Sequence, residues 1–206
     1  MELFLIRHGQ SVGNIARDQD LPDSPLTGLG KEQAGRIADY LGDKPITRII
    51  SSPLIRALQT AQSLARKISL PIEIWKELYE YRKGAPFIGA AGDEFLAAYS
   101  EAAVSDEWLE EGGWKYPGHE DQAAVTRRAA AIVHKFRQCG DNDCIAVFAH
   151  GTFNDYLIRE LLDIADKPHI QFDQLNTGLN HFVLGRGDIK VRKLNVTEHL
   201  NLALQS

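Results

Sequence analysis

The sequence predicts an α/β protein: a three-layer α/β/α sandwich with a mostly parallel central sheet and a small inserted cap. The first observation behind this is that short apolar runs of strand length alternate with longer segments whose apolar residues recur at helical spacing. Such alternation is typical of a sheet with helices on both faces. The second is composition: the chain has 206 residues, 44% hydrophobic and 25% charged, which suits one globular domain spanning residues 1–206.

The first part of the chain has clear boundary signals. Residues 3–6 form a short apolar run that is typical of a buried strand. Thr27 has the hydroxyl of a helix N-cap, and the helix that follows is expected to end at Gly42. Residues 46–50 are predicted as the second strand.

A second helix is predicted directly after that strand. Ser52 suits the N-cap and Pro53 the first helical position, and apolar residues continue at helical spacing to Ile68. A third short strand is expected at residues 71–75. These two elements complete the alternating pattern of the first third of the chain.

Residues 77–117 differ from the rest because their apolar periodicity is weaker and they contain several glycines. We expect this segment to form the inserted cap, with a helix near residues 93–110. The alternation then resumes. The remaining predicted elements are a helix at 120–138, a strand at 145–149, a helix at 152–162 and two closing strands at 179–184 and 190–194.

Charge and cysteine content exclude several classes of protein. The formal net charge is −5, whereas a protein that binds nucleic acid or an anionic membrane needs a basic surface. The N-terminal apolar run is broken at Arg7, so neither a signal peptide nor a membrane span is predicted, and a cytoplasmic location is expected. Cys139 and Cys144 lack the partner ligands of a metal site, and no metal or cofactor is expected. The oligomeric state stays open, a homo-oligomer included.

A first polar motif, Arg7-His8-Gly9-Gln10-Ser11, follows the first predicted strand, with Asn14 beyond it. Active groups of open α/β sheets gather at the carboxyl ends of the strands. Adjacent Arg and His side chains repel each other if both are charged, and a bound anion would remove that repulsion. The motif therefore suggests a phosphate or carboxylate site, with an ordinary polar cluster as the alternative.

Two further motifs lie at strand ends. Arg56 is close to the start of the second predicted helix, and helix N-termini suit anions. The alternative for Arg56 is a solvated surface side chain. His150 stands where the strand at 145–149 gives way to a helix, and its alternative role is that of a structural hydrogen-bonding histidine. Together, two arginines and two histidines would fit a doubly charged phosphoryl group.

Arg7-His8-Gly9, the segment Ser51-Ser52-Pro53-Leu54-Ile55-Arg56-Ala57-Leu58-Gln59-Thr60-Ala61 and His150-Gly151 resemble, in order and spacing, the motifs of the histidine phosphatase superfamily, also called the phosphoglycerate mutase-like family. The resemblance implies that His8 is the nucleophile and forms a phosphohistidine. Its other ring nitrogen would need an acceptor such as a backbone carbonyl. Arg7, Arg56 and a protonated His150 would hold the phosphoryl oxygens.

The resemblance also implies substrate contacts and an acid. Asn14 matches the phosphate-contacting asparagine of the family, and the substrate-binding set is completed by Ser11, Gly151 and Thr152. The family uses a carboxylic acid that protonates the leaving oxygen and then activates water. Its motif has the form Leu-x-Glu with a glycine four residues later, which Leu78-Tyr79-Glu80 and Gly84 fit. Glu80 is therefore the candidate acid, and Glu77 is its competitor.

Several departures favour a phosphatase over a mutase. Mutases of the family carry Glu-Arg-His-Tyr-Gly at the acid motif, whereas this chain has Glu80-Tyr81-Arg82-Lys83-Gly84 and is too short for the mutase insertion. A separate difference from the family, which does not bear on this choice, is His119-Glu120-Asp121 in place of the common Gly-Glu-Ser. For the adjacent arginines Arg127 and Arg128 we expect a solvated or packing role. The expected function is hydrolysis of a small phosphomonoester of undetermined class, with phosphoryl transfer of the mutase type or non-catalytic phospho-ligand binding as alternatives.

Overall fold

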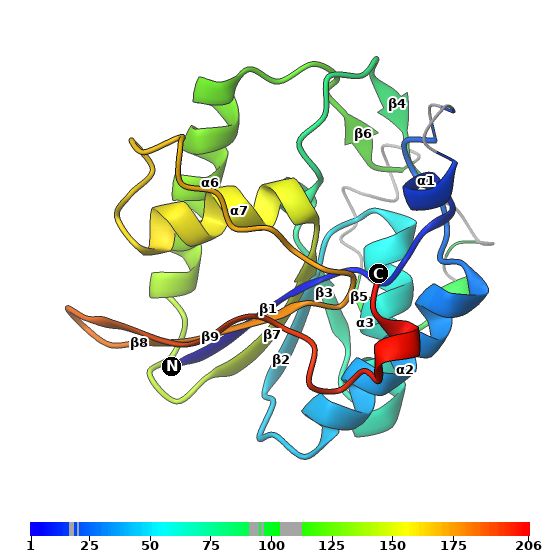
Figure 1. Cartoon of the computed structure of the whole chain (residues 1–206), viewed down its shortest axis with the longest axis horizontal. Helices are drawn as coiled ribbons and strands as arrows, with labels where there is room; N and C mark the ends of the chain where they lie inside the picture. Colours follow the sequence, from blue (N-terminus) through cyan, green and yellow to red (C-terminus); the bar gives the residue numbers. More distant parts are fainter. Residues whose placement is uncertain (17–18, 20, 91–94, 96, 104–112) are drawn as a thin grey trace.

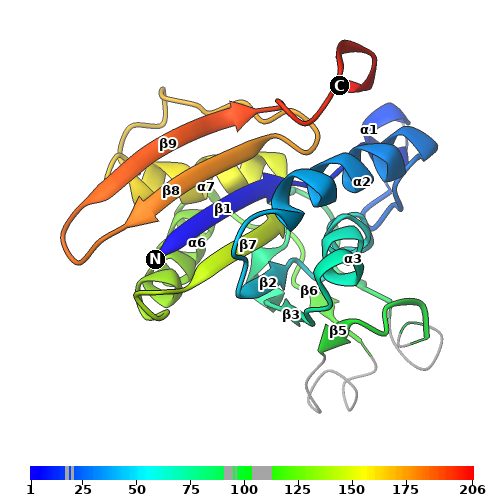
Figure 2. The ribbon, with the colours of Figure 1, turned by 90° about the horizontal axis from the view of Figure 1, so that it is seen from below.

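A seven-stranded sheet in the order β5-β3-β2-β7-β1-β8-β9 forms the middle of the protein. The computed structural model describes residues 1–16, 19, 21–90, 95, 97–103 and 113–206 (Figure 1). The first five strands in that order run parallel, and β8 and β9 are antiparallel to their neighbours (Figure 2). The strands are β1 (Glu2–Arg7), β2 (Arg48–Ser51), β3 (Ile72–Ile74), β5 (Ala102–Ala103), β7 (Cys144–Ala149), β8 (Leu179–Leu184) and β9 (Ile189–Val196).

Helices cover both faces of this sheet. The helices α2 (Gly28–Gly42) and α3 (Ile55–Ile68) lie on one face, and α6 (Gln122–Arg137) and α7 (Gly151–Leu161) lie on the other (Figure 1). Side chains of a strand alternate between faces. Accordingly, β1 packs Phe4 and Ile6 against α2 and α3, and Leu3 and Leu5 against α6 and α7. The predicted three-layer sandwich with a mostly parallel sheet is thus confirmed.

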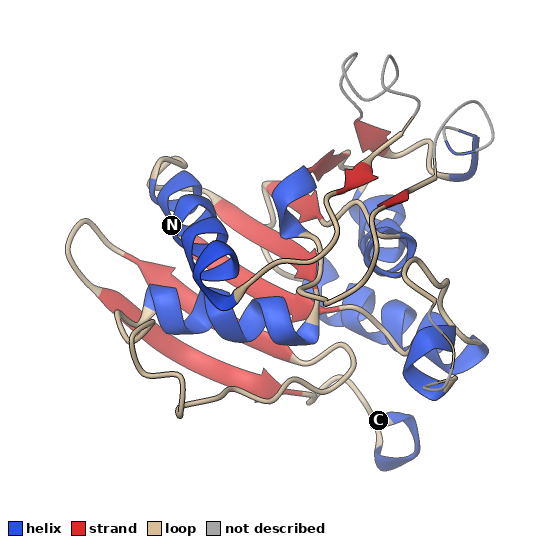
Figure 3. Ribbon diagram, turned by 90° about the horizontal axis from the view of Figure 1, so that it is seen from above, coloured by secondary structure: helices blue, strands red, loops and turns tan. Residues whose placement is uncertain are grey.

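The segment predicted as a cap is divided between two structures. The strands β4 (Phe87–Ile88) and β6 (Lys115–Tyr116) pair into a two-stranded sheet apart from the central one (Figure 3). Residues 102–103, by contrast, form β5 and extend the central sheet beside β3. This part of the segment is therefore not cap. The helix predicted near residues 93–110 is confirmed at residues 95 and 97–98, where the Tyr99 N–H donates to the Phe95 carbonyl at 2.9 Å. Most of the rest of that range lies outside the described residues, and at 102–103 the prediction of a helix is wrong.

Helix boundaries follow the predicted signals except where a side chain is used at the site. Thr27 is an N-cap as predicted, because its Oγ1 accepts a hydrogen bond from the Gly30 N–H at 3.0 Å. The prediction of Ser52 as an N-cap is wrong, since α3 begins at Ile55 after Leu54. The Oγ of Ser52 lies 2.7 Å from Nε2 of His150, so its hydroxyl is engaged with a site residue.

Short elements complete the described chain. They are α1 (Val12–Ile15) and two 3-10 turns, η1 (Lys76–Leu78) and η2 (Leu202–Leu204). In the described part of the chain, the helices are too short or too polar to cross a membrane.

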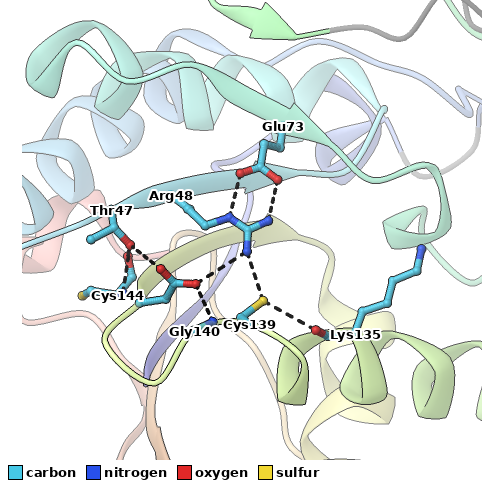
Figure 4. Close-up of polar contacts among 8 residues, drawn as sticks. Thr47, Arg48, Glu73, Lys135, Cys139, Gly140 and Cys144 are labelled. Carbon is cyan, nitrogen blue, oxygen red and sulfur yellow. Dashed lines mark hydrogen bonds and ion pairs between the residues drawn. The ribbon is translucent and has the colours of Figure 1, made fainter.

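Near the amino ends of β2 and β7, charged side chains pair with one another (Figure 4). Arg48 donates two hydrogen bonds to the carboxylate of Glu73, at 2.8 and 2.6 Å. A third Arg48 nitrogen lies 3.1 Å from Sγ of Cys139 and 3.8 Å from the Asp143 carboxylate. Cys139 and Cys144 are free thiols, and Cys144 is buried, as its apolar surroundings predict. At this end of the sheet, the Arg48 guanidinium therefore has carboxylate partners within the protein.

Candidate active site

The three polar motifs meet at the carboxyl ends of three adjacent strands, β2, β7 and β1. Arg7 is in register with Ala149, and the His8 N–H donates to the Ala149 carbonyl at 3.0 Å. The rings of His8 and His150 have centroids 5.2 Å apart. Strand register therefore brings the predicted site residues together, although Arg7 and His150 are far apart in sequence.

His8 is buried and its hydrogen bonds define its tautomer. Its Nδ1 lies 2.7 Å from the Gly9 carbonyl oxygen, which can only accept, so Nδ1 carries the proton. Nε2 then has a free lone pair, and it accepts a hydrogen bond from Nε of Arg56 at 3.2 Å. Burial is the largest cause that lowers the pKa of His8 well below 6.5, followed by Arg56 and Arg7. His8 is thus a neutral nucleophile candidate, held by a backbone carbonyl as expected.

The backbone beside His8 is held by a close contact with α2. A Cβ atom on Gly9 would lie 2.5 Å from the Gly30 carbonyl oxygen, and one on Gly30 would lie 2.0 Å from that of Gln10. Both positions therefore require glycine, because neither backbone can move without the other. The Gly9 N–H also donates to Oγ1 of Thr60 on α3, which fixes the loop after β1 from a second side.

Arg56 is buried and Arg7 is partly buried, and the described partners of both guanidinium groups are backbone carbonyls and His8 rather than carboxylates. Nη1 of Arg7 donates to the Gln174 carbonyl at 2.5 Å, and Nη1 of Arg56 donates to the Pro22 carbonyl at 3.0 Å. Burial lowers the pKa of both side chains, and the Glu80 carboxyl acts in the opposite direction. Two buried or partly buried cations without a directly paired carboxylate among the described residues form a site for an anion.

His150 is fully buried at the start of α7. Its Nδ1 has no hydrogen-bond partner among the described residues. Burial, then Arg56, His8 and Arg7, lower the pKa of His150 well below 6.5. In the ligand-free protein, burial and the neighbouring cations disfavour the protonated form of His150, and its protonation with a phosphoryl group bound stays a prediction. A bound dianion would act in the opposite direction and favour the imidazolium.

Glu80 is partly buried and its carboxylate accepts three backbone hydrogen bonds. The N–H groups of Tyr81 and Phe153 donate to Oε1 at 2.8 and 2.9 Å, and that of Thr152 donates to Oε2 at 3.2 Å. Burial raises the pKa of Glu80 above 4.5, although Arg56 and these N–H groups lower it in part. The competitor Glu77 is exposed and pairs with Lys135 at 3.1 Å. The geometry favours Glu80 as the acid.

The remaining predicted residues have supporting contacts. Oδ1 of Asn14 accepts from the Ser11 N–H at 3.0 Å, so Ser11 holds Asn14 in place. A Cβ on Gly151 would lie 3.3 Å from Nε of Arg7, which places this backbone directly against the guanidinium. The Thr152 N–H binds Glu80 rather than pointing to the phosphoryl site. None of these contacts tests substrate binding. The substrate-binding roles of Asn14, Ser11, Gly151 and Thr152 therefore stay a prediction.

Sequence analysis missed Asn176, whose Nδ2 donates to the His8 carbonyl at 3.1 Å and to Oδ1 of Asn14 at 3.3 Å. The Thr177 N–H donates to the same His8 carbonyl at 3.2 Å. A signal was present, because these polar residues directly precede β8. An antiparallel neighbour of β1 begins where β1 ends, so the start of β8 must lie at the site.

A cavity of about 410 Å³ opens beside Glu80. Four of the predicted site residues line it, namely Arg7, Glu80, Gly151 and Thr152. The other lining residues are mostly polar and are Gln122, Asp155, Tyr156, Arg159, Pro168, Gln171, Phe172, Asp173 and Gln174. The cavity thus connects the candidate acid with solvent, and has room for the alcohol part of a phosphomonoester.

A neutral buried histidine, two arginines and a carboxylic acid define a candidate phosphoryl-transfer site on an α/β sheet. The sequence profile of the histidine phosphatase superfamily (branch 1) matches residues 3–197, and the chain belongs to this superfamily.

Named relatives include phosphatases and mutases. The chain is 31% identical over 170 residues to glucosyl-3-phosphoglycerate phosphatase of Mycolicibacterium vanbaalenii, covering 79% of this chain and 74% of that protein. It is 29% identical over 178 residues to the probable phosphoglycerate mutase GpmB of Yersinia enterocolitica, with 83% and 78% covered. Phosphoserine phosphatase of Entamoeba histolytica, solved with 3-phosphoglyceric acid, superposes with a TM-score of 0.69 at 25% identity and 97% and 99% coverage.

Proposed function

We propose that the protein is a phosphomonoesterase that works through a phosphohistidine on His8. The observation that carries the proposal is the pair of hydrogen bonds that leaves Nε2 of His8 as a buried lone pair beside Arg56. A nucleophile must be unprotonated at its attacking atom, and this tautomer meets that condition. An incoming phosphoryl oxygen would take over the Arg56 N–H, which frees Nε2 for attack.

In the first step, Nε2 of His8 attacks phosphorus and the bond from phosphorus to the alcohol oxygen breaks. Glu80, protonated, gives its proton to that oxygen as it leaves. Arg7, Arg56 and His150 hold the other phosphoryl oxygens and offset the charge that spreads over them in the transition state. The free alcohol leaves through the cavity beside Glu80.

In the second step, the Glu80 carboxylate takes a proton from water. The water oxygen attacks phosphorus and the phosphorus–nitrogen bond breaks. Inorganic phosphate is released, and His8 returns to its neutral form. Glu80 is then protonated again for the next cycle. The substrate is a small phosphomonoester whose alcohol part is polar, because polar side chains predominate around the cavity.

The alternative of mutase-type transfer is supported by the mutase relative. Hydrolysis in ¹⁸O-labelled water separates the two. A phosphatase incorporates label into inorganic phosphate from a panel of phosphorylated metabolites, whereas a mutase passes the phosphoryl group to another hydroxyl and gives a phosphorylated product free of label.

The His8→Ala variant tests the nucleophile and the non-catalytic alternative together. We expect its hydrolysis of phenyl phosphate to fall by about 10⁴-fold or more, because removal of a nucleophile abolishes the covalent route. Circular dichroism checks that the variant is folded. Background hydrolysis by both the wild type and His8→Ala would instead support a phospho-ligand-binding member of the family.

A further inference from the structure

A buried ion pair lies behind Glu80, away from the phosphoryl site. Arg128 of α6 donates from Nε and Nη2 to the two carboxylate oxygens of Glu120, at 2.9 and 2.5 Å. Their side chains are 9% and 7% exposed, so both groups have lost most of their hydration. Burial of an ion pair is often no more stabilising than an apolar replacement, and stability alone gives no reason for this pair.

The remaining Arg128 nitrogen holds the backbone that leads to Glu80. Nη1 donates to the carbonyl oxygens of Glu77 at 2.7 Å and Tyr79 at 2.9 Å. Both carbonyls lie within three residues before Glu80, in a stretch that begins with the 3-10 turn η1. Because one planar guanidinium binds both carbonyls and Glu120, it fixes the direction in which the chain enters Glu80.

The same guanidinium also contacts the helix that receives the Glu80 carboxylate. Its central carbon lies 3.7 Å from the ring centre of Tyr79 and 3.9 Å from that of Phe153. Phe153 is in the first turn of α7, and its N–H donates to Glu80 at 2.9 Å. Arg128 therefore contacts the residue before Glu80 and one of the residues that bind its carboxylate.

We propose that Arg128, oriented by Glu120, is a positioning residue that holds the Glu80 carboxyl where it meets the leaving oxygen. The proposal rests on the proposed function, in which Glu80 is the proton donor. Glu120 offsets the charge of Arg128, and Arg128 contributes least among the causes that lower the pKa of His150. Of the two roles expected for Arg128 from sequence, the solvated one is wrong and the packing one is confirmed, because its guanidinium is buried against the rings of Tyr79 and Phe153.

Two phenyl esters of similar shape test this role. Phenyl phosphate has the poorer leaving group and needs the acid, whereas 4-nitrophenyl phosphate leaves more easily. We expect Arg128→Lys to lower kcat for phenyl phosphate by about tenfold or more and to lower kcat for 4-nitrophenyl phosphate much less. Arg128 makes four hydrogen bonds from three nitrogens, whereas lysine keeps the charge but has one nitrogen with three N–H donors and cannot reproduce them all. A purely structural role would lower both rates equally, which overturns the proposal.

Arg127→Lys is the matched control, because Arg127 is the exposed neighbour of Arg128 on the same helix. It is expected to leave both rates unchanged. Glu120→Gln tests the other half of the pair and is expected to give the same selective loss as Arg128→Lys, only smaller. If Arg128→Lys proves unfolded by circular dichroism, Glu120→Gln decides the question by the same two rates.

A double-mutant cycle with Glu80→Gln separates this inference from the proposed function. If Arg128 acts through Glu80, then Arg128→Lys adds almost nothing to the loss caused by Glu80→Gln on phenyl phosphate. Losses that multiply would show that Arg128 acts independently, which overturns the inference. If Glu80→Gln itself shows no preference between the two esters, the proposed acid fails, and that failure is visible without any Arg128 variant.

Discussion

Arginine side chains have opposite kinds of partner at the two ends of the central sheet. At the amino end, Arg48 pairs with Glu73, which raises the pKa of the guanidinium, and Asp143 lies nearby. At the carboxyl end, burial lowers the pKa of Arg7 and Arg56, whose described hydrogen bonds go to carbonyls and to His8. At the amino end the arginine is paired with a carboxylate of the protein. At the carboxyl end the two arginines have no directly paired carboxylate among the described residues and can bind an anionic ligand. Uncompensated buried charge is unfavourable for folding, so it indicates function at the carboxyl end.

Among the arginine substitutions that compare the two ends, the largest effect is expected from removing a cation at the carboxyl end. Arg56→Met should lower kcat/KM for phenyl phosphate by about 10²–10³-fold, because one donor to the transition-state oxygens is lost. Its free energy of unfolding in urea should stay within about 1 kcal/mol of the wild type, because the variant also removes a buried charge. A large loss of stability with little loss of activity would reverse the contrast between the two ends.

The pH dependence of kcat/KM tests whether the carboxyl end of the sheet contains a proton donor, Glu80. The lowered pKa keeps His8 neutral to below pH 6.5, and the raised pKa keeps Glu80 protonated to above pH 4.5. The kcat/KM for phenyl phosphate should therefore fall as pH rises through the pKa of Glu80. Glu80→Gln should remove this fall and lower the rate about 10²-fold at the optimum. The same profile with 4-nitrophenyl phosphate is the control for titration of the ester itself.

The stabilisation of the folded protein by inorganic phosphate should differ between variants at the two ends of the sheet. Inorganic phosphate at about 100 times its dissociation constant should raise the free energy of unfolding by about 2.7 kcal/mol. Arg48→Met should respond as the wild type does, and Arg56→Met should respond much less. Thermal melts with and without phosphate measure the effect, with chloride at equal ionic strength as the reference. Equal responses from the two variants would contradict an anion site at Arg56.

The smallest effect is expected at the amino end. Arg48 and Glu73 have side chains that are 28% and 36% exposed, so their pair is partly solvated. Arg48→Met should lower the free energy of unfolding by about 1 kcal/mol and leave kcat/KM for phenyl phosphate unchanged. Urea unfolding and steady-state rates on one preparation provide both values. A changed rate would mean that the two ends are coupled through the sheet.

Much of the fold could be predicted because its signals are local. Apolar runs marked β1 and β7, and the Thr27 hydroxyl marked the start of α2. The strand β5 was missed, because two alanines become a strand only through pairing with β3. Ser52 was misassigned as an N-cap for a related reason: its partner, His150, is distant in sequence.

For the site, residues at strand ends could be found, but residues that act through other residues could not. Arg7 is the last residue of β1 and His8 follows it directly, so their place at the strand end needs no knowledge of packing. Asn176 and Arg128 bind backbone carbonyl oxygens of other residues. Every residue has such a carbonyl, so the sequence does not show which of them will be bound. The direction of the pKa shift of His150 could not be predicted from sequence, because it depends first on burial and then on the cations that surround the ring.

The position of β1 in the sheet has a consequence for how the enzyme is made. β1 precedes both of its sheet neighbours along the chain, yet it lies between β7 and β8, which pair with it along residues 144–149 and 179–183. Contacts between such distant parts of a chain slow folding. During synthesis one edge of β1 stays unpaired until residues 144–149 have been made, and the other until residues 179–183 have been made. The His8 carbonyl accepts hydrogen bonds from Asn176 and Thr177, so the surroundings of the nucleophile are complete only once the chain has reached β8.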